Sequence, residues 1–307
     1  MREWFQLGLT EQKERLTQAR AIGIHAIKIT DHKLSDTEWL VVTDLSQAEY
    51  DYRTMLTEIC ARAGIAPSQI LFVWASPPCN TISPCGTVND QRGSGYRIYT
   101  QPHWPPRTDG SKYAQLAQKH DGMTSKIVQA LTHCIHAHGI HTAVENPRGG
   151  MERQHFMNSP SWQAATEKQI VDYCAYRHPY KKPENIWVSE FGWEPTGITG
   201  DGRCGNKCES GTVRTDTNKY RHHEVLSGAA GTGPKGKGIE QQKNSVPDML
   251  LTELLTAVLA QRTDEHRTWV IDLFAGYGSM RAAAKKKGLN YLAVDFRDLL
   301  SAKATTH

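Results

Sequence analysis

The stretch Thr268–Phe296, TWVIDLFAGYGSMRAAAKKKGLNYLAVDF, contains the pattern that decides the fold. An apolar strand runs into a turn with two glycines, and a helical segment and a second apolar strand follow, as is typical of a parallel α/β sheet. Glycines let a ligand approach the backbone, and Asp295 at the end of the second strand can accept hydrogen bonds from ribose hydroxyls. Because Arg281 stands where a third glycine would complete GxGxxG, a dinucleotide is disfavoured. The pattern fits a nucleotide-like ligand or an ordinary tight turn.

Helical and strand-like segments alternate before this stretch. Helical patterns cover residues 9–23, 47–64, 125–139 and 245–262, and strand-like patterns cover residues 25–29, 39–45, 70–76 and 140–144. This alternation predicts an α/β fold with a doubly wound, mostly parallel sheet. Residues 149–243 lack such regularity, and the glycine-rich part after Trp193 is expected to be irregular and exposed.

The composition of the 307 residues excludes several classes of protein. No apolar stretch approaches the roughly 20 residues of a membrane span, and the N-terminus lacks the pattern of a secretory signal. We therefore expect an intracellular protein that is not secreted and has no membrane partner. Seven cysteines form no disulfide framework, so each is free, metal-bound or catalytic. The net charge of +4 permits a nucleic-acid partner without requiring one.

Two short motifs follow predicted strands. Pro77-Pro78-Cys79 follows the strand at 70–76, and Glu145-Asn146-Pro147 follows the strand at 140–144. Taken singly, Cys79 fits a buried structural cysteine and Glu145 fits a turn cap. Together, at the ends of neighbouring strands, a thiol nucleophile and a carboxylic acid can act on one substrate.

These motifs resemble those of the S-adenosylmethionine-dependent DNA cytosine-5 methyltransferases. "DLFAGYGS" and "AVDF" are similar to the family's first two motifs, and Pro-Pro-Cys is similar to its fourth. The resemblance implies a class I methyltransferase fold and a reaction on a flipped cytosine of double-stranded DNA. Cys79 would attack C6 and Glu145 would support N3, with Pro78 and Asn146 as further catalytic residues.

The resemblance also implies a set of residues that bind S-adenosyl-L-methionine. Phe274 would lie against the adenine, Gly276 and Gly278 would leave room for the methionine part, and Asp295 would hold the ribose. "KNSVP" at 243–247 is similar to the tenth motif, and "VVTDL" at 41–45 is the best candidate for the third. The full expected set is Asp44, Asn244, Ser245, Asp272, Phe274, Ala275, Gly276, Tyr277, Gly278 and Asp295.

The order of these motifs implies a circular permutation, because the cofactor motif comes last instead of first. The implied parts are an N-terminal extension (1–36), a catalytic half (37–148), a target-recognition region (149–243) and a cofactor-binding half (244–307). "DYCAYRHPYKKPENIWVS" at 172–189 follows the seventh and eighth motifs in part, with Lys181 and Lys182 in place of arginines. We expect a monomer of the phage type, with a role in restriction and modification.

Three other functions fit parts of the sequence. Ser76-Pro77-Pro78 also occurs in the amino-group methyltransferases of DNA, but these need an aromatic residue where Cys79 stands. An RNA cytosine-5 methyltransferase would use the same chemistry. A non-catalytic DNA-binding relative would need neither Cys79 nor Glu145.

The region at 149–243 raises the question of a metal site. Cys204 and Cys208 are separated by three residues, with His222 and His223 nearby, so a zinc site is one alternative. The other, which we favour from the sequence, is that no metal binds and that these are thiols in a basic loop. A zinc site would need Cys174 or a distant residue as a further ligand.

Overall fold

The structure is a computed structural model. It describes residues 32–35, 38–42, 51–82, 96–213, 215, 220–222, 245–275 and 279–295. By its contacts the chain divides into two compact units, residues 1–31 and 32–307, and every described residue belongs to the second. The predicted helix at 9–23 and the predicted strand at 25–29 lie outside the described residues.

The second unit is built on an eight-stranded sheet with the order β1-β2-β10-β9-β3-β4-β6-β5. Its five inner strands, from β2 to β4, pair in parallel, while β1, β6 and β5 at the two edges pair in antiparallel fashion. The bounds are β1 (His32–Ser35), β2 (Glu38–Val42), β3 (Ile70–Ala75), β4 (His141–Pro147), β5 (Thr166–Asp172), β6 (Pro183–Ser189), β9 (Trp269–Leu273) and β10 (Asn290–Asp295). The predicted α/β fold with a mostly parallel sheet is confirmed.

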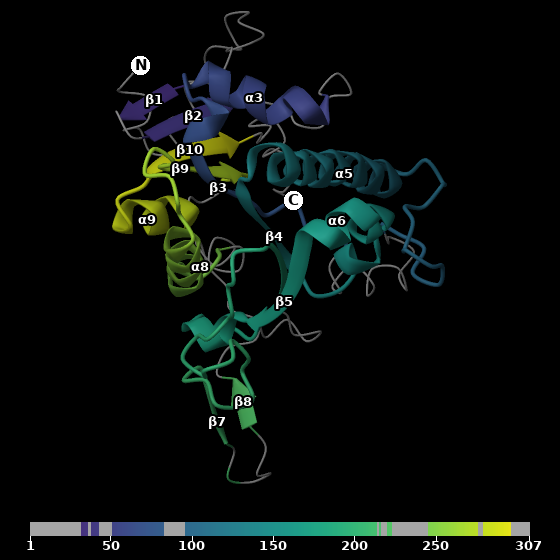
Figure 1. Cartoon of the computed structure of the whole chain (residues 1–307). Coiled ribbons are helices and arrows are strands. Elements are labelled where there is room, and N and C mark those ends of the chain that lie inside the picture. Colours follow the sequence, from purple (N-terminus) through teal and green to yellow (C-terminus); the bar gives the residue numbers. More distant parts are fainter. Residues whose placement is uncertain are drawn as a thin grey trace, which may run out of the picture. The chain divides into compact units, whose positions relative to one another are not determined.

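Helices cover both faces of this sheet (Figure 1). On one face α3 (Tyr52–Arg62) and α5 (Lys112–His138) share a buried core with alternate strand residues such as Val73 and Ile271. On the other face α8 (Asp248–Ala260) and α9 (Ser279–Lys286) share a second core with Trp74 and Val270. Because inner strands are buried on both faces, they appear in the sequence as continuous apolar runs.

Local signals fix the helix ends. The Ser111 hydroxyl accepts a hydrogen bond from the Ala114 N–H at 3.2 Å and caps α5, which ends at Gly139 with φ +58°. The predicted helix at 125–139 is therefore confirmed at its end, but α5 begins earlier because the polar segment after Ser111 continues the same buried stripe. Pro247, inside the predicted helical pattern at 245–262, has a ψ of 131° and lies at the N-cap, so α8 begins at Asp248.

The sequence pattern predicts no strand within residues 149–243, but β5 and β6 lie there and extend the main sheet beyond β4. Their pairing with β4 is long-range and their register depends on contacts that no local pattern shows. The same region contains η2 (Met151–Arg153), η3 (His155–Asn158), α6 (Pro160–Ala165) and η4 (Tyr173–Tyr176). A separate pair, β7 (Gly211–Val213) and β8 (Tyr220–His222), forms an antiparallel ladder.

The strand order reverses between β9 and β3, which are themselves parallel neighbours. The chain passes from β9 through α9 to β10 on one side, and from β3 through α5 to β4 on the other. The carboxyl ends of two such strands diverge and leave a crevice, which is the usual ligand site of open α/β sheets. Ala75 at the end of β3 pairs with Leu273 of β9 and with Val144 of β4, so the three predicted motifs begin side by side.

None of the helices within the described ranges combines the length and the apolar character needed to span a bilayer.

Candidate active site

Cys79 lies four residues beyond the end of β3 and is partly exposed. Its loop is held to the neighbouring strand, because the Asn146 side-chain amide donates a hydrogen bond to the Pro77 carbonyl at 3.0 Å. The Ile82 N–H donates to the Cys79 carbonyl at 3.0 Å and closes the turn after the cysteine. Pro78 between them is also partly exposed. The structure thus places Pro78 and Cys79 in a loop that Asn146 holds to the end of β4.

Glu145 follows Val144 in β4 and is only 5% exposed. The Tyr173 hydroxyl in η4 donates a hydrogen bond to Glu145 Oε1 at 2.9 Å. Burial raises the pKa of Tyr173 well above its ordinary value, so the phenol keeps its proton and remains a donor. One carboxylate oxygen is therefore held in place while the carboxyl group stays near the end of the strand.

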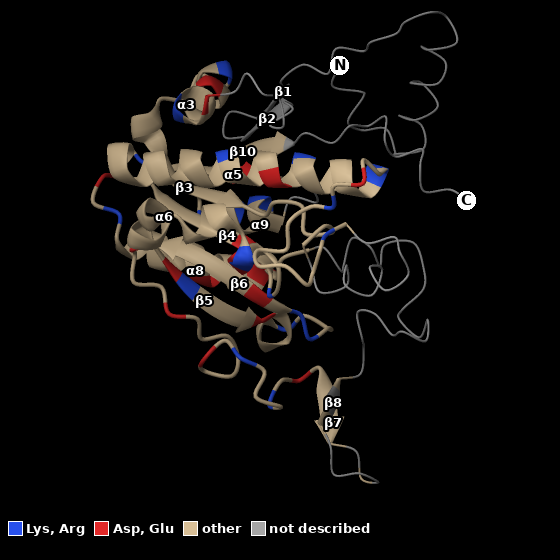
Figure 2. Cartoon of the chain, turned by 90° about the vertical axis from the view of Figure 1, so that its right-hand side faces the viewer, with Lys and Arg blue, Asp and Glu red and all other residues tan. Residues whose placement is uncertain are grey.

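A buried ion pair completes this site. Lys182 Nζ lies 2.8 Å from Glu184 Oε1, and the two side chains are 15% and 0% exposed. Burial raises the pKa of Glu184 well above its ordinary value, although Lys182 opposes that shift. Burial lowers the pKa of Lys182, but the neighbouring Glu184, Glu145 and Cys79 together raise it by more than burial lowers it. The net shift is upward, so the amine stays charged. Figure 2 shows acidic and basic positions meeting near β4 and β6.

The cluster also sets the ionisation of the candidate nucleophile. Burial raises the pKa of the Cys79 thiol to about 11, and the nearby carboxyl groups of Glu145 and Glu184 raise it too. The positive charge of Lys182 acts in the opposite direction and is the largest influence that favours the thiolate. At neutral pH Cys79 is therefore a thiol, and Lys182 makes this thiol easier to ionise.

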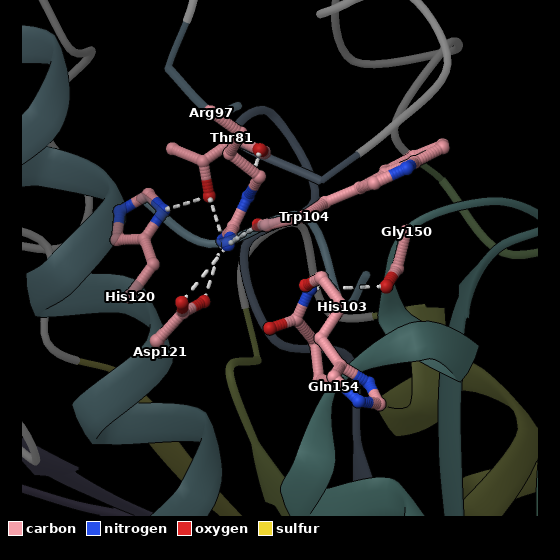
Figure 3. Close-up of polar contacts among 8 residues, drawn as sticks. All are labelled: Thr81, Arg97, His103, Trp104, His120, Asp121, Gly150 and Gln154. Carbon is pink, nitrogen blue, oxygen red and sulfur yellow. Dashed lines mark hydrogen bonds and ion pairs between the residues drawn. The ribbon is translucent and has the colours of Figure 1, made fainter. Parts of the chain in front are cut away.

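A second set of contacts fixes the loop after Cys79 (Figure 3). Arg97 is fully buried and binds Asp121 of α5 through both terminal nitrogens, at 2.9 and 2.5 Å. Its Nε donates to the Thr81 carbonyl at 2.6 Å, and Nη1 donates to the Trp104 carbonyl at 3.0 Å. The forked guanidinium thus joins three separate segments. They are the loop at Thr81, two residues after Cys79, the segment at Trp104, and α5.

Neighbouring groups tighten the same loop. His120 lies 3.3 Å from the Thr81 hydroxyl, and burial lowers the pKa of His120 to about 4, so its ring is neutral at pH 7. The Gly150 N–H donates to the Ile82 carbonyl at 2.9 Å. A Cβ at Gly150 would lie 2.5 Å from that carbonyl oxygen and 2.8 Å from the Trp104 ring, so the close approach requires glycine.

On the expected cofactor side, the backbone leaves β9 sharply. Phe274 has φ +102°, which is rare for a residue with a side chain, and the N–H groups of Phe274 and Ala275 lie 3.0 and 3.1 Å from the Val294 carbonyl. Asp272 is 3% exposed and accepts a hydrogen bond from the Tyr291 hydroxyl at 2.9 Å. The described residues that lead toward 276–278 therefore leave the sheet at the strand-order reversal between β9 and β3.

Of the remaining residues expected to bind the cofactor, only Asp295 and Ser245 belong to the described part of the chain. Asp295 ends β10 and pairs with Val42 at the end of β2, and Ser245 lies just before α8. Five predicted residues lie outside the described part of the chain: Asp44, Asn244, Gly276, Tyr277 and Gly278.

Sequence reasoning did not assign roles to Tyr173, Glu184 or Arg97. Glu184 carried a usable signal, because a glutamate inside the apolar strand PENIWVS must find a partner when that strand is buried. Lys182 was noted only as a substitute for an arginine. Elsewhere, Cys204 and Cys208 come together with Cys174 and His222.

Comparisons with known proteins add the following. No family model matches the chain. Over 218 residues the chain is 26% identical to a "Probable DNA (cytosine-5)-methyltransferase" of Frog virus 3 (isolate Goorha). The aligned stretch covers 71% of this chain and 88% of the viral protein. A solved structure of a candidate DNA modification methylase from Thermus thermophilus aligns with 86% of this chain and 91% of its own, at 12% identity and a TM-score of 0.35. A likeness at that TM-score does not establish a shared fold.

Proposed function

We propose that the protein is an S-adenosylmethionine-dependent DNA methyltransferase that acts on C5 of cytosine. The observation that carries this proposal is the placement of Cys79 and Glu145 at the carboxyl ends of adjacent parallel strands, beside the crevice at β9. The similarity to the viral protein named as a probable DNA (cytosine-5)-methyltransferase supports the same activity. The substrate is double-stranded DNA and the protein acts as a monomer.

The chain's own residues perform the addition and the proton transfers. The Cys79 thiolate adds to C6 of the flipped cytosine, while the Glu145 carboxyl group hydrogen-bonds to N3 and withdraws electrons from the ring. Addition at C6 makes C5 nucleophilic, and C5 would take the methyl group from the sulfonium of S-adenosylmethionine, whose S–CH3 bond breaks to leave the neutral thioether S-adenosylhomocysteine. Loss of the C5 proton to a base then expels the Cys79 sulfur and restores the aromatic ring.

Lys182 makes the first step easier. Its ammonium group favours the thiolate form of Cys79, and its own charge is held by Glu184 at 2.8 Å. Tyr173 holds Glu145 Oε1 through its hydrogen bond, and the Glu184 carboxyl group also interacts with that of Glu145. The Arg97 contacts keep the loop that contains Cys79 in one conformation, which limits the motion of the nucleophile.

The proposed cofactor is S-adenosyl-L-methionine, which supplies an electrophilic methyl group when bound. The end of β9 fits it, because the partly buried Phe274 lies where the chain leaves that strand and Asp295 ends the neighbouring strand β10. We propose that the cofactor is also bound by Asp44, Asn244, Ser245, Asp272, Ala275 and residues 276–278.

The strand order supports a circular permutation. β9 and β10, which would hold the cofactor, are last in the chain but lie in the middle of the sheet beside β3. Residues 261–268 connect α8 to β9 by a short link, so a chain that begins at β9 and a chain in which β9 follows α8 can form the same sheet. We propose that 149–243 includes the target-recognition part.

Product analysis tests this function. Plasmid DNA incubated with the full chain and labelled S-adenosylmethionine is digested to nucleosides and separated by chromatography with mass detection. The proposal predicts label in 5-methylcytosine alone, and none with the Cys79→Ser variant. Label in N4-methylcytosine or N6-methyladenine would contradict it in favour of an amino-group methyltransferase, and label only when RNA is supplied would contradict the DNA assignment.

A further inference from the structure

We propose that Cys174, Cys204, Cys208 and His222 bind one Zn²⁺ ion that fixes the β7–β8 hairpin to the end of β5. These residues come from three separate segments: η4, the loop before β7, and β8. Nothing in the methyl transfer reaction uses this site, so the inference does not rest on the proposed function.

The four ligand atoms have the spacing of a tetrahedral site. The sulfurs of Cys204 and Cys208 lie 3.6 Å apart, and His222 Nε2 lies 3.3 and 3.2 Å from them. All four ligand atoms, with Cys174 Sγ, lie within 4.8 Å of one another. A zinc ion with bonds of about 2.3 Å to sulfur and 2.0 Å to nitrogen separates its ligands by about 3.5 to 3.8 Å. Three thiolates and one imidazole are a common ligand set of structural zinc.

The local backbone brings Cys208 back to Cys204. Gly205 and Asn206 both have positive φ, +50° and +61°, and the Lys207 N–H donates to the Cys204 carbonyl at 2.7 Å. Asp172 at the end of β5 accepts from the Cys204 N–H at 2.9 Å. This tight turn presents two sulfurs on the same side and is anchored to the main sheet.

Within the described residues, the hairpin has no other core that would hold it. In that part of the chain, the third buried cluster consists of Cys174, Cys204 and Cys208, with Tyr220 packed against it. The three cysteines are at most 3% exposed. Residues 190–210, all of them described, form no helix or strand. Among the described residues from 203 to 222, none belongs to the two large core clusters. A metal ion that joins three segments would supply the crosslink that this part of the chain needs.

A disulfide explains the cluster less well. The 3.6 Å between the Cys204 and Cys208 sulfurs is far longer than the roughly 2.05 Å of an S–S bond. A disulfide would also use only two of the four side chains and would leave the convergence of Cys174 and His222 without a cause. A bound metal uses all four.

Metal content tests the site directly. The full chain is expressed with added zinc, purified under reducing conditions without chelator, and analysed by plasma mass spectrometry, with no DNA or S-adenosylmethionine present. We expect one zinc per chain. Replacing zinc with Co²⁺ is expected to give the intense visible absorption of a tetrahedral thiolate site. Folded chain with less than about a tenth of a zinc per molecule and no cobalt absorption would overturn the proposal.

Matched variants locate the ion. Cys208→Ser is expected to lose the metal, whereas Cys134→Ser, which changes a buried cysteine in α5, is expected to keep it. If Cys208→Ser does not fold, His222→Cys offers a second test, because four thiolates still bind zinc and His222→Ala does not. Equal zinc in Cys208→Ser and the parent chain would contradict the assignment, and so would a Cys204–Cys208 disulfide in the metal-free protein.

Discussion

Cysteine has different surroundings in two regions of the molecule. One region is the Cys79 site, and the other is the cluster of Cys174, Cys204, Cys208 and His222. Cys79 is single, partly exposed and lies beside a lysine and two glutamates. The three other cysteines are buried together with one another and a histidine. A thiol next to a fixed positive charge is suited to a nucleophile, whereas several thiols that converge on one point are suited to binding a metal. The surroundings of a cysteine decide its role.

The largest effect should come from replacing the nucleophile. Cys79→Ser is expected to lower methyl transfer by on the order of a thousandfold or more, because serine cannot supply a comparable nucleophile at neutral pH. The same variant is expected to keep its full zinc content. Activity is measured with labelled cofactor and plasmid DNA. If Cys79→Ser retained a tenth of the activity, or lost its zinc, the division of roles between the two regions would fail.

Glu145→Gln should have the next largest effect. The amide keeps the size and can still accept from Tyr173, but it cannot donate a proton to N3, so kcat is expected to fall by about a hundredfold to ten-thousandfold. Steady-state kinetics on DNA provide the measurement, and circular dichroism checks the fold. Unchanged kcat would show that the Cys79 site does not need its carboxyl group.

Lys182→Met should alter the ionisation of Cys79. The pKa of Cys79 is about 11 in the parent chain, so the reactive thiolate fraction rises roughly tenfold per pH unit below that value. Removing the positive charge raises this pKa further, and we expect iodoacetamide labelling of Cys79 at pH 8 to slow by about tenfold.

Mass spectrometry of the Cys79 peptide follows the labelling rate between pH 7 and 10. Lys182→Arg retains the charge and is expected to label at close to the parent rate. Equal labelling of the methionine variant and the parent at every pH would contradict the role of Lys182.

Tyr173→Phe is expected to have the smallest effect. It removes one hydrogen bond to Glu145 and no charge, so kcat is expected to fall by about fivefold to tenfold, as for the loss of roughly 1 kcal/mol. Cys174 follows directly in η4, so the zinc content is measured alongside and is expected to stay at one per chain. Loss of zinc in this variant would mean that the two regions are not independent.

The sequence predicted the inner strands because they are buried on both faces and appear as unbroken apolar runs. β3, β4, β9 and β10 therefore lie close to their expected positions, and the carboxyl ends of β3, β4 and β9 lie side by side at Ala75, Val144 and Leu273. The pairing of Cys79 with Glu145 could be anticipated for the same reason, since the carboxyl ends of neighbouring parallel strands converge.

Other parts of the site depend on contacts between distant segments. Arg97 lies in a polar stretch, and nothing local indicates that it is fully buried against Asp121. Lys182 and Glu184 reach Cys79 only because β6 pairs antiparallel with β4, a register that local patterns do not specify. The metal cluster was one alternative in the sequence, but the position of Cys174 beside Cys204 requires the turn of the chain after β5.

The most direct test of the central claim is a covalent trap at Cys79. Duplex DNA that contains 5-fluorocytosine cannot lose a proton from C5, so the attacking cysteine remains bonded to C6 after methyl transfer. Incubation of the full chain with this DNA and S-adenosylmethionine, followed by denaturing electrophoresis and peptide mass spectrometry, identifies the bonded residue. We predict a stable protein–DNA adduct on the peptide containing Cys79. Methylation of normal DNA without any adduct, or an adduct on another cysteine, would contradict the account.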